Sequence, residues 1–305
     1  MKILITGAAG YLGNYIYHTI TNDNKNNIVG FDIRGKEVQR LDITNSKAFK
    51  DLLIDTKPDL IIHTAAMKDL AECEKNKQKS FLVNSLSTEI ITEYVKEYAP
   101  ETKVIYISSD VIFDGTRGNY SPSDTPNPIN WYGKTKCFSE IILKSIKNYV
   151  ILRTALIIGE INQEYINKLK VEVNNSILQN QTLLPYYVYG RLMNGKEVKL
   201  PTSIISNPTP LPLLGEAITS LVDNFKVGTY HITGSTQISR FDFAKEIIKK
   251  FNLNGSLLVI DESSIVKYRP KNISFNSRES MKALKLDYDK WTIDKYLSLL
   301  NFDLL

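Results

Sequence analysis

Short apolar runs alternate with amphipathic stretches over roughly the first half of the chain. The apolar runs occupy 2–6, 29–32, 59–63, 103–107 and 149–153. Helical periodicity begins after Gly10 and then recurs at 44–57, 79–98 and 131–147. Strands that are each followed by a helix form βαβ units and a parallel sheet. The pattern therefore predicts an α/β protein with a doubly wound parallel sheet.

The pattern changes from Gly159 onward, where charged and Asn-rich stretches no longer fit a simple βαβ repeat. Helical periodicity returns at 208–225, 240–251 and 291–300, with an apolar strand at 228–232. These features predict two domains. Residues 1–158 with about 207–235 form a nucleotide-binding domain, and about 159–206 with 236–305 form a smaller C-terminal α/β substrate lobe.

Three glycines follow the first apolar run, at Gly7, Gly10 and Gly13. A strand, a glycine turn and a helix N-terminus form the unit that holds a dinucleotide pyrophosphate, because free backbone N–H groups face the anion there. Asp32 ends the second apolar run, where a carboxylate can accept hydrogen bonds from the adenosine ribose. Glycine spacing alone would indicate only a turn, but this context predicts a Rossmann-like fold. The spacing GxxGxxG resembles the extended branch of the short-chain dehydrogenase/reductase superfamily.

Composition and charge narrow the class of partner. The 305-residue chain has a net charge of +5, with scattered Lys and Arg residues, which makes nucleic acid a poor partner.

Two cysteines, Cys73 and Cys137, cannot build a disulfide framework, and no apolar run is long enough to cross a bilayer. With no signal peptide in view, we expect a cytoplasmic protein that does not bind membranes. The three histidines have no metal-ligand spacing, so no metal site is expected.

The catalytic candidates are Ser109, Tyr132 and Lys136. Tyr132 and Lys136 are four residues apart and share one face of a predicted helix. An ammonium beside a phenol is expected to lower the pKa of the phenol, so that Tyr132 can exchange a proton near neutral pH. Ser109, at the end of the fourth strand, can offer a hydroxyl to a carbonyl oxygen. Together these groups can support hydride transfer from a nicotinamide to a carbonyl carbon.

Two longer stretches, 107–115 and 128–136, resemble the dTDP-4-dehydrorhamnose reductase family, and weaker likeness extends over nearly the whole chain. The resemblance implies a nicotinamide cofactor, a nucleotide-linked 4-keto sugar as substrate, and Ser109, Tyr132 and Lys136 as the catalytic set. The predicted cofactor-binding residues are Gly7, Gly10, Tyr11, Leu12, Gly13, Asp32, Arg34, Asp42, Ile43, Thr64, Ala65, Ala66, Asn84, Tyr132 and Lys136.

Some positions depart from the family pattern. Met67, Lys68, Ala71 and Val111 replace residues that are usual near the substrate, and 159–206 matches poorly. The identity of the sugar therefore stays open.

Two further points stay open in the cofactor site. Asn84 either supports the cofactor pocket through the backbone or ends a turn. Asp32 favours NAD, whereas Arg34 and Lys36 can attract the extra phosphate of NADP. The cofactor is therefore NAD or NADP, with a slight lean to NAD.

Two other functions remain open. An epimerase or dehydratase of the same superfamily would retain its nicotinamide, although Val111 after Asp110 argues against the acidic pair that dehydratases carry. A regulatory subunit resembling that of methionine adenosyltransferase would bind a dinucleotide and dock on an enzyme without catalysis. Extended reductases often dimerise through helices that flank the sheet, so a homodimer is a further expectation.

Overall fold

The computed structural model describes residues 1–21, 25–35, 38–159, 183–263, 265 and 268–302. The chain divides into two compact units. Unit 1 comprises Met1–Asp114, Pro122–Thr154 and Gly215–His231, and unit 2 comprises Gly115–Ser121, Ala155–Leu214 and Ile232–Leu305.

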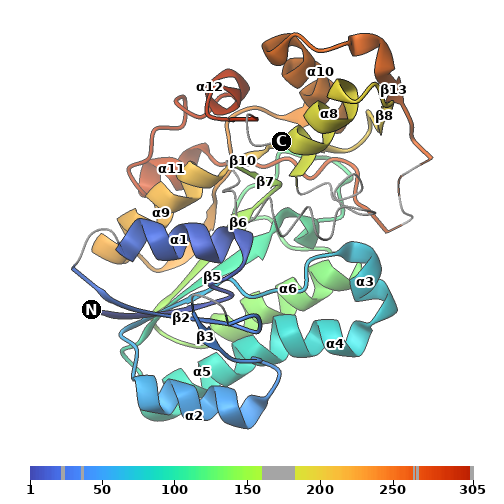
Figure 1. The fold of residues 1–305 in the computed structure, drawn as a ribbon. Helices are drawn as coiled ribbons and strands as arrows, with labels where there is room; N and C mark the ends of the chain where they lie inside the picture. The colour runs from blue at the N-terminus through green and yellow to red at the C-terminus, as the bar shows by residue number, and fades with distance from the viewer. Residues whose placement is uncertain (22–24, 36–37, 160–182, 264, 266–267, 303–305) are drawn as a thin grey trace. The chain divides into compact units, whose positions relative to one another are not determined.

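Unit 1 is built on a seven-stranded parallel sheet with the order β11-β6-β5-β4-β1-β2-β3 (Figure 1). The strands are β1 (Lys2–Thr6), β2 (Asn27–Asp32), β3 (Gln39–Arg40), β4 (Leu60–His63), β5 (Lys103–Ser109), β6 (Tyr149–Thr154) and β11 (Gly228–His231). The chain runs outward from β1 to β2 and β3, then returns to β4 on the other side of β1. The gap between the ends of β1 and β4 is thus the topological switch point, where such sheets bind ligands. The doubly wound Rossmann-like sheet predicted from the sequence is confirmed.

Helices cover both faces of this sheet. They are α1 (Tyr11–Thr21), α2 (Ser46–Thr56), α3 (Leu70–Lys75), α4 (Lys77–Phe81), α5 (Ser87–Tyr98), α6 (Trp131–Leu143) and α9 (Leu211–Asp223), with a π-helical turn η1 (Leu82–Leu86) and a 3₁₀ turn η2 (Asp110–Ile112). Figure 1 shows α2, α5 and α6 on one face of the sheet and α1 on the other. Because both faces are covered, the middle positions of the central strands are apolar, and Ile3, Leu4 and Ile5 are fully buried.

Several predicted boundaries differ from the structure. The stretch 79–98 is interrupted by the π turn η1, because Thr88 and Ser139 donate hydrogen bonds to the carbonyl of Asn84 at its centre. Helix α2 is capped by Asn45 rather than Thr44, since the Asn45 side chain accepts from the N–H of Ala48 at 3.2 Å. Helix α6 ends at Leu143, earlier than the predicted 147.

Unit 2 consists of short two-stranded sheets and four described helices. The strands are β7 (Ile157–Ile158), β8 (Val198–Leu200), β9 (Ile205–Ser206), β10 (Thr209–Pro210), β12 (Ile238–Ser239) and β13 (Leu258–Ile260). The helices are α8 (Leu184–Met193), α10 (Arg240–Phe251), α11 (Arg278–Ala283) and α12 (Ile293–Leu297), with a 3₁₀ turn η4 (Gly255–Leu257). Apolar side chains of α8, α10 and α12 form its core, including Val188, Phe243 and Leu297. Most of the poorly matching segment 159–206 can be placed here, but its residues 160–182 lie outside the described part.

The predicted domain division needs one clear correction. The sequence leaves 115–121 in the first domain, whereas the structure places these residues in unit 2. The N–H of Tyr120 donates to the carbonyl of Ser274 at 2.9 Å, and the N–H of Asn119 donates to Ser274 Oγ at 2.9 Å. These backbone bonds to a segment about 150 residues further on tie the loop to unit 2. The return of the chain to unit 1 at Gly215 also comes later than the predicted 207.

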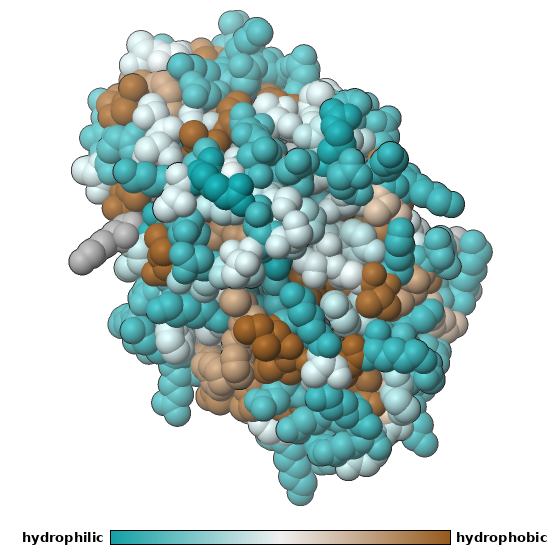
Figure 2. All heavy atoms as spheres, turned by 180° about the vertical axis from the view of Figure 1, so that it is seen from behind, coloured by the Kyte–Doolittle hydropathy of each residue, from teal (hydrophilic) through white to brown (hydrophobic). Residues whose placement is uncertain are grey.

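The surface carries few large apolar side chains. Figure 2 shows brown apolar residues gathered in small patches among hydrophilic ones on the face seen from behind. Helix α6 contributes two exposed apolar side chains, Phe138 and Ile141. In the described part of the chain, no helix combines the length and the apolar character that crossing a membrane requires. The expected homodimer and the absence of nucleic-acid partners stay predictions.

Candidate active site

The glycine turn between β1 and α1 is held by close backbone packing. Gly7 has φ of +70°, a conformation that favours glycine, and the N–H of Gly10 donates to its carbonyl at 2.8 Å. A Cβ on Gly13 would lie 2.1 Å from the carbonyl oxygen of Gly7. The first turn of α1 can therefore pack against the end of β1 only without a side chain at position 13. The N-terminal amides of α1, at Tyr11, Leu12 and Gly13, precede the first intrahelical bond, in which Asn14 donates to the carbonyl of Gly10 at 2.8 Å.

The end of β4 lies directly beside this turn. A Cβ on Gly7 would lie 2.7 Å from the backbone nitrogen of Ala65, and the Thr64 hydroxyl donates to the carbonyl of Thr6 at 2.7 Å. Ala66 is exposed, and Ala65 is partly exposed. Small side chains at the switch point leave backbone accessible, which suits a flat ligand lying against it.

Asp32 and Arg34 form an ion pair at the end of β2. Arg34 donates to Asp32 Oδ1 through its backbone N–H at 2.9 Å and through Nε at 3.0 Å. The Asp32 side chain is only 6% exposed, whereas the Arg34 side chain is 51% exposed. The carboxylate is thus partly neutralised, and a cation remains available next to the glycine turn. Lys36 lies outside the described residues.

The predicted residues Asp42 and Ile43 have different environments. The Asp42 carboxylate accepts from the backbone N–H of Thr44 at 2.9 Å and from its hydroxyl at 2.7 Å, so it stabilises its own turn. Ile43 is 9% exposed and packs in the apolar core of unit 1. Asp42 itself is exposed and remains free to meet a ligand through its second oxygen.

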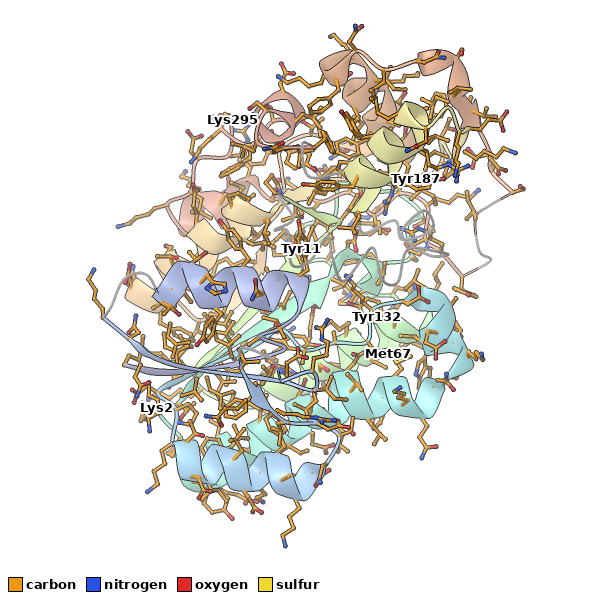
Figure 3. All side chains as sticks on the ribbon, viewed as in Figure 1. Lys2, Tyr11, Met67, Tyr132, Tyr187 and Lys295 are labelled. Atoms are coloured by element: carbon orange, nitrogen blue, oxygen red, sulfur yellow. The ribbon has the colours of Figure 1, made fainter. Side chains whose placement is uncertain are left out.

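The catalytic candidates lie at the N-terminal end of α6. Asn130 caps this helix by accepting from the N–H of Gly133 at 2.7 Å, and Glu74 accepts from the N–H of Trp131 at 2.6 Å. A Cβ on Gly133 would lie 2.2 Å from the carbonyl oxygen of Val111. These contacts place the first turn of α6 tightly against η2, with Tyr132 within it. Figure 3 shows Tyr11, Met67 and Tyr132 toward the same end of the sheet.

The structure brings Ser109 and Tyr132 together. Ser109, the last residue of β5, lies close enough to the phenol of Tyr132 to lower its pKa, against larger effects that raise it. Tyr132 keeps some exposure to solvent, yet its pKa is raised because of the protein packed around the phenol, with smaller contributions from the charges of Cys73 and Asp110. The predicted lowering of the Tyr132 pKa is therefore wrong for the protein by itself. In this state Tyr132 is a proton donor rather than a phenolate.

Lys136 lies one turn further along α6 and is 3% exposed. Burial lowers its pKa to about 7, although the negative charges of Glu140 and Cys73 oppose the shift. Its Nζ lies 4.3 Å from the ring centroid of Tyr106 on β5, a cation–π distance. The ammonium is thus held inside the protein at a pKa near neutrality, which explains why it does not dominate the pKa of Tyr132.

Asn84, at the centre of η1, is 1% exposed and acts on backbone. Its Oδ1 accepts from the N–H of Met67 at 2.8 Å, and its Nδ2 donates to the carbonyl of Met67 at 2.9 Å. Nδ2 also donates to the hydroxyl of Thr135 on α6 at 3.1 Å. Of the two roles left open by the sequence, this geometry favours support of the pocket through the backbone, since the amide fixes the segment that follows β4.

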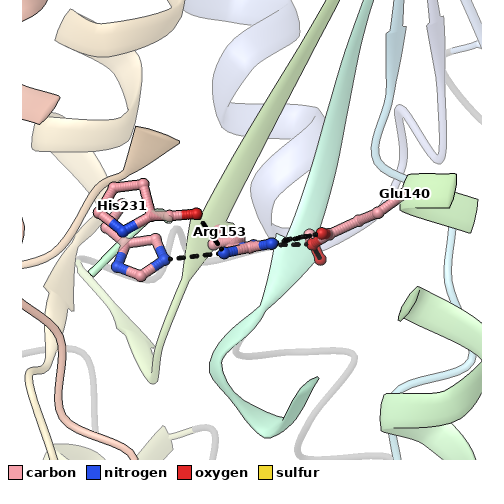
Figure 4. A network of polar contacts seen from close by, with 5 residues as sticks. Glu140, Arg153 and His231 are labelled. Atoms are coloured by element: carbon pink, nitrogen blue, oxygen red, sulfur yellow. Dashed lines mark hydrogen bonds and ion pairs between the residues drawn. The ribbon is translucent and has the colours of Figure 1, made fainter. Parts of the chain in front are cut away.

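A buried charge network is centred on Arg153 and Glu140, which Figure 4 shows together with His231. Arg153 of β6 donates from Nη2 to Glu140 Oε2 at 2.7 Å and from Nε to Oε1 at 3.0 Å. Its Nη1 donates to the carbonyl of Pro122 at 3.1 Å and to His231 Nε2 at 3.3 Å. The hydroxyl of Ser108 donates to Glu140 at 2.5 Å. The Arg153 guanidinium therefore joins α6, β11 and the loop before α6, and Glu140 connects it to Ser108 of β5.

Sequence reasoning did not single out Glu140 or Asn130. Glu140 lies four residues after Lys136, so helical spacing alone could have placed it on the same face. Asn130 immediately before a predicted helix is a recognised capping signal. Arg153 had no such signal, because its hydrogen-bond partners Glu140, Pro122 and His231 come from three separate segments.

The glycine turn, Asp32 and the switch-point loop fit a nicotinamide dinucleotide. Gly7 and Gly13 have no room for a side chain, because a Cβ on either would collide with the backbone of Ala65 or of Gly7, and this tight turn is the form that dinucleotide-binding turns take. Within the described residues, no three His, Cys, Asp or Glu side chains gather where they could hold a metal ion. His63 is buried between Thr6 and Ser87 at 2.6 and 3.1 Å, and burial lowers its pKa to about 3.

Comparison with solved structures supports the fold. A hypothetical dTDP-4-dehydrorhamnose reductase from Sulfolobus tokodaii is 29% identical with a TM-score of 0.79, covering 100% of this chain and 98% of that one. A dTDP-4-dehydrorhamnose reductase from Bacillus anthracis in complex with NADP has a TM-score of 0.81 at 24% identity, covering 98% and 96%. A related Bordetella bronchiseptica enzyme, WbmH, was solved with NAD⁺ and has a TM-score of 0.77 at 17% identity.

Similar sequences fall into two groups. Methionine adenosyltransferase 2 subunit beta from Bos taurus is 28% identical over 276 residues, 89% of this chain and 79% of that protein. dTDP-4-dehydrorhamnose reductase from Aggregatibacter actinomycetemcomitans is 24% identical over 302 residues, 95% of each.

The fold is of the extended short-chain dehydrogenase/reductase kind. The family model described as RmlD substrate binding domain matches residues 1–298, and the chain belongs to this family. The resemblance inferred from the sequence is thereby confirmed.

Proposed function

We propose that the protein is an NAD(P)H-dependent reductase of a nucleotide-activated 4-keto sugar. The observation that carries the proposal is that Tyr132 and Lys136 lie one turn apart on α6, whose first turn packs on the turn η2 that follows Ser109 at the end of β5. A regulatory protein that only binds a dinucleotide has no chemical need for this arrangement. Family membership and reductase relatives over nearly the full length support the same conclusion.

Each side chain has a defined role in this reaction. A bound reduced nicotinamide supplies the hydride to the keto carbon. Tyr132, with its raised pKa, holds a proton at neutral pH and donates it to the keto oxygen as negative charge develops there. Ser109 orients the phenol, and the Lys136 ammonium stabilises the phenolate that remains and binds ribose hydroxyls. The buried position of Lys136 keeps water from competing for its charge.

We propose that both NADH and NADPH are accepted, with a slight preference for NADH. Asp32 can receive ribose hydroxyls, but its charge is offset by Arg34 at 3.0 Å. The Arg34 guanidinium remains half exposed and can receive a phosphate in bidentate fashion. The exposed Lys68 lies near enough for the charge of Arg34 to act on it, although burial by its surroundings and then that charge lower the pKa of Lys68. Arg34→Ala should weaken NADPH more than NADH.

The test is a screen of dTDP-, UDP- and GDP-linked 4-keto sugars with NADH and with NADPH, followed by nicotinamide absorbance. We expect stoichiometric oxidation of the cofactor with at least one sugar nucleotide. Tyr132→Phe should reduce kcat about 10²- to 10⁴-fold with little change in cofactor affinity. Tyr98→Phe, which changes an exposed phenol on α5, is the matched control and should leave kcat unchanged.

Two outcomes would replace the proposal. Sugar conversion without net cofactor oxidation would assign an epimerase or dehydratase. The strong sequence likeness to the methionine adenosyltransferase subunit is the observation behind a second candidate, a regulatory dinucleotide-binding subunit. Absence of turnover, together with a change in the activity of a methionine adenosyltransferase on mixing, would favour that candidate.

A further inference from the structure

The buried ammonium of Lys136 has an aromatic ring as its partner. Its Nζ lies over the ring of Tyr106, 4.3 Å from the centroid. Among the described residues, this ammonium forms no ion pair and donates no hydrogen bond. Glu140, one turn further along α6, is already engaged by Arg153 at 2.7 Å. A buried cation in this position is attracted electrostatically by the face of the ring.

Tyr106 is held firmly in the central sheet. It is fully buried at the middle of β5, and it is paired with His63 of β4 across the parallel ladder. The two rings stack with their centroids 5.7 Å apart. The His63 ring is itself hydrogen-bonded to Thr6 at 2.6 Å and to Ser87 at 3.1 Å, which fixes its orientation. The sheet therefore determines where the Tyr106 ring meets Lys136.

We propose that Tyr106 is a positioning residue for the reduction: its ring keeps the Lys136 ammonium in place and charged without an ion pair. A carboxylate partner would cancel the charge of the ammonium and compete with the groups that it must meet. An aromatic face attracts the cation and leaves its charge to act on the phenolate of Tyr132 and on ribose hydroxyls. The inference rests on the proposed function for its catalytic consequence, whereas the contact between ring and ammonium can be tested without a substrate.

The titratable groups around Lys136 come from four elements. Burial has the largest effect and lowers the pKa of Lys136 to about 7, while Glu140 of α6 and Cys73 of α3 raise it. His63 of β4 is neutral, because burial and then the charge of Lys136 lower its pKa to about 3. Tyr106 of β5 is also uncharged, since burial raises its pKa well above the ordinary value. A ring that favours the ammonium raises the pKa of Lys136, so its removal should lower that pKa further.

Tyr106→Leu is the sharpest test, since it removes the ring, whereas Tyr106→Phe keeps the ring and removes only the hydroxyl. Tyr94→Leu is the matched control for lost packing, because Tyr94 is 1% exposed and belongs to the same apolar core. The Tyr94 ring stacks on Tyr98 rather than on a lysine. Melting curves establish that the variants are folded. If Tyr106→Leu does not fold, Tyr106→Met, whose longer side chain fills more of the space, takes its place.

The first measurement needs no substrate. Protein labelled with ¹³C at the lysine ε carbon is titrated around neutral pH, and the Lys136 signal is assigned by its absence in Lys136→Met. We expect the Lys136 midpoint to lie at least about half a pH unit lower in Tyr106→Leu than in the wild type. Tyr106→Phe and Tyr94→Leu should keep the wild-type midpoint. A smaller fall, no change or a rise in Tyr106→Leu would overturn the proposal, and so would an equal fall in either of the other two variants.

The second measurement uses turnover of a 4-keto sugar at different pH values. A smaller ammonium fraction at Lys136 should lower kcat of Tyr106→Leu about threefold or more at pH 8, but less than about twofold at pH 6. Tyr106→Phe should follow the wild-type profile. The same loss of kcat at both pH values would show that the ring acts through packing alone and would contradict the proposal. Failure of all keto sugars would instead count against the proposed function alone, because the titration of Lys136 needs no substrate.

Discussion

The two ends of the candidate site are built in different ways. The glycine turn after β1 is shaped by backbone: the N–H of Gly10 bonds Gly7, and Gly13 is small enough to pack on that carbonyl. The catalytic end is shaped by buried side chains, with Glu140 and Arg153 behind Lys136. A backbone turn depends on neighbours in sequence, whereas a charge network depends on the completed fold. Substitutions in the glycine turn should therefore destabilise the protein by steric conflict. Substitutions in the charge network should destabilise it by leaving a buried charge without its partner.

Glu140→Gln should produce the largest effect. It leaves the Arg153 guanidinium, whose side chain is 1% exposed, without its counter-charge. Breaking a buried pair by removing one partner costs about 3–5 kcal/mol. Urea denaturation should show a loss of this size, and Glu140→Gln with Arg153→Met should recover part of it. Glu101→Gln, which breaks an exposed pair with Lys147, is the control and should change the free energy of unfolding by less than about 0.5 kcal/mol.

Gly13→Ala tests the backbone end. Its Cβ would lie 2.1 Å from a backbone oxygen, so either the turn or α1 must shift. Overpacking of this kind lowers the free energy of unfolding by about 1–3 kcal/mol, and we expect a loss near the upper end of this range. Calorimetry should also show that the variant no longer binds NADH. Gly190→Ala in α8 has nothing within 4 Å of the added Cβ and should be neutral or stabilise by up to about 1 kcal/mol. Equal destabilisation by both changes would count against the steric account.

This comparison also explains how far the sequence could predict the structure. The strands, the glycine turn and the place of Asp32 depend on local pattern, and helix α10 has its predicted bounds of 240–251. The π turn at Asn84 was not predictable, because the bonds that open it come from Thr88 and from Ser139 of α6. Residues 115–121 belong to unit 2, and the hydrogen bonds that Tyr120 and Asn119 donate to the carbonyl and the hydroxyl of Ser274 have no signal in the local sequence.

In the candidate site, too, the local sequence predicts some features, and contacts made by the completed fold determine the others. Helical spacing correctly brought Tyr132 and Lys136 onto one helix, α6, but it could not indicate how deeply each would be surrounded by protein. Burial is the largest cause of both pKa shifts, raising that of Tyr132 and lowering that of Lys136. The expected direction for Tyr132 was wrong for this reason, since spacing identifies a neighbour and burial depends on every element packed around it.

Lys136→Met should show opposite effects on stability and on activity. The folded pKa of Lys136 is about 7, against an ordinary value of 10.5, so between these values the unfolded chain binds a proton that the folded chain does not. Wild-type stability should therefore rise as pH increases over this window, and the charged lysine should cost most below pH 7. At pH 6.5 the variant should be more stable by on the order of 2 kcal/mol, with little pH dependence of its own.

The activity of Lys136→Met should fall about 10²-fold or more, because the phenolate left on Tyr132 loses its counter-charge. Lys134→Met, two residues earlier on an exposed position of α6, is the control for both measurements. Thermal melts across pH 6–10 give the stability profile. A lysine variant that is less stable than the wild type at every pH would show that the cation–π contact with Tyr106 outweighs the cost of burial.

The smallest effect is expected for Asn130→Ala, which removes the cap of α6. The lost bond from the N–H of Gly133 should cost about 1 kcal/mol. Asn45→Ala removes the equivalent cap of α2, a helix without candidate catalytic residues, and should cost a similar amount. If the cap only stabilises a helix, the two variants should have equal kcat. Because Tyr132 lies in the first turn of α6, we expect kcat to fall several-fold in Asn130→Ala and to stay unchanged in Asn45→Ala. Both values of kcat are measured under conditions where the variants remain fully folded.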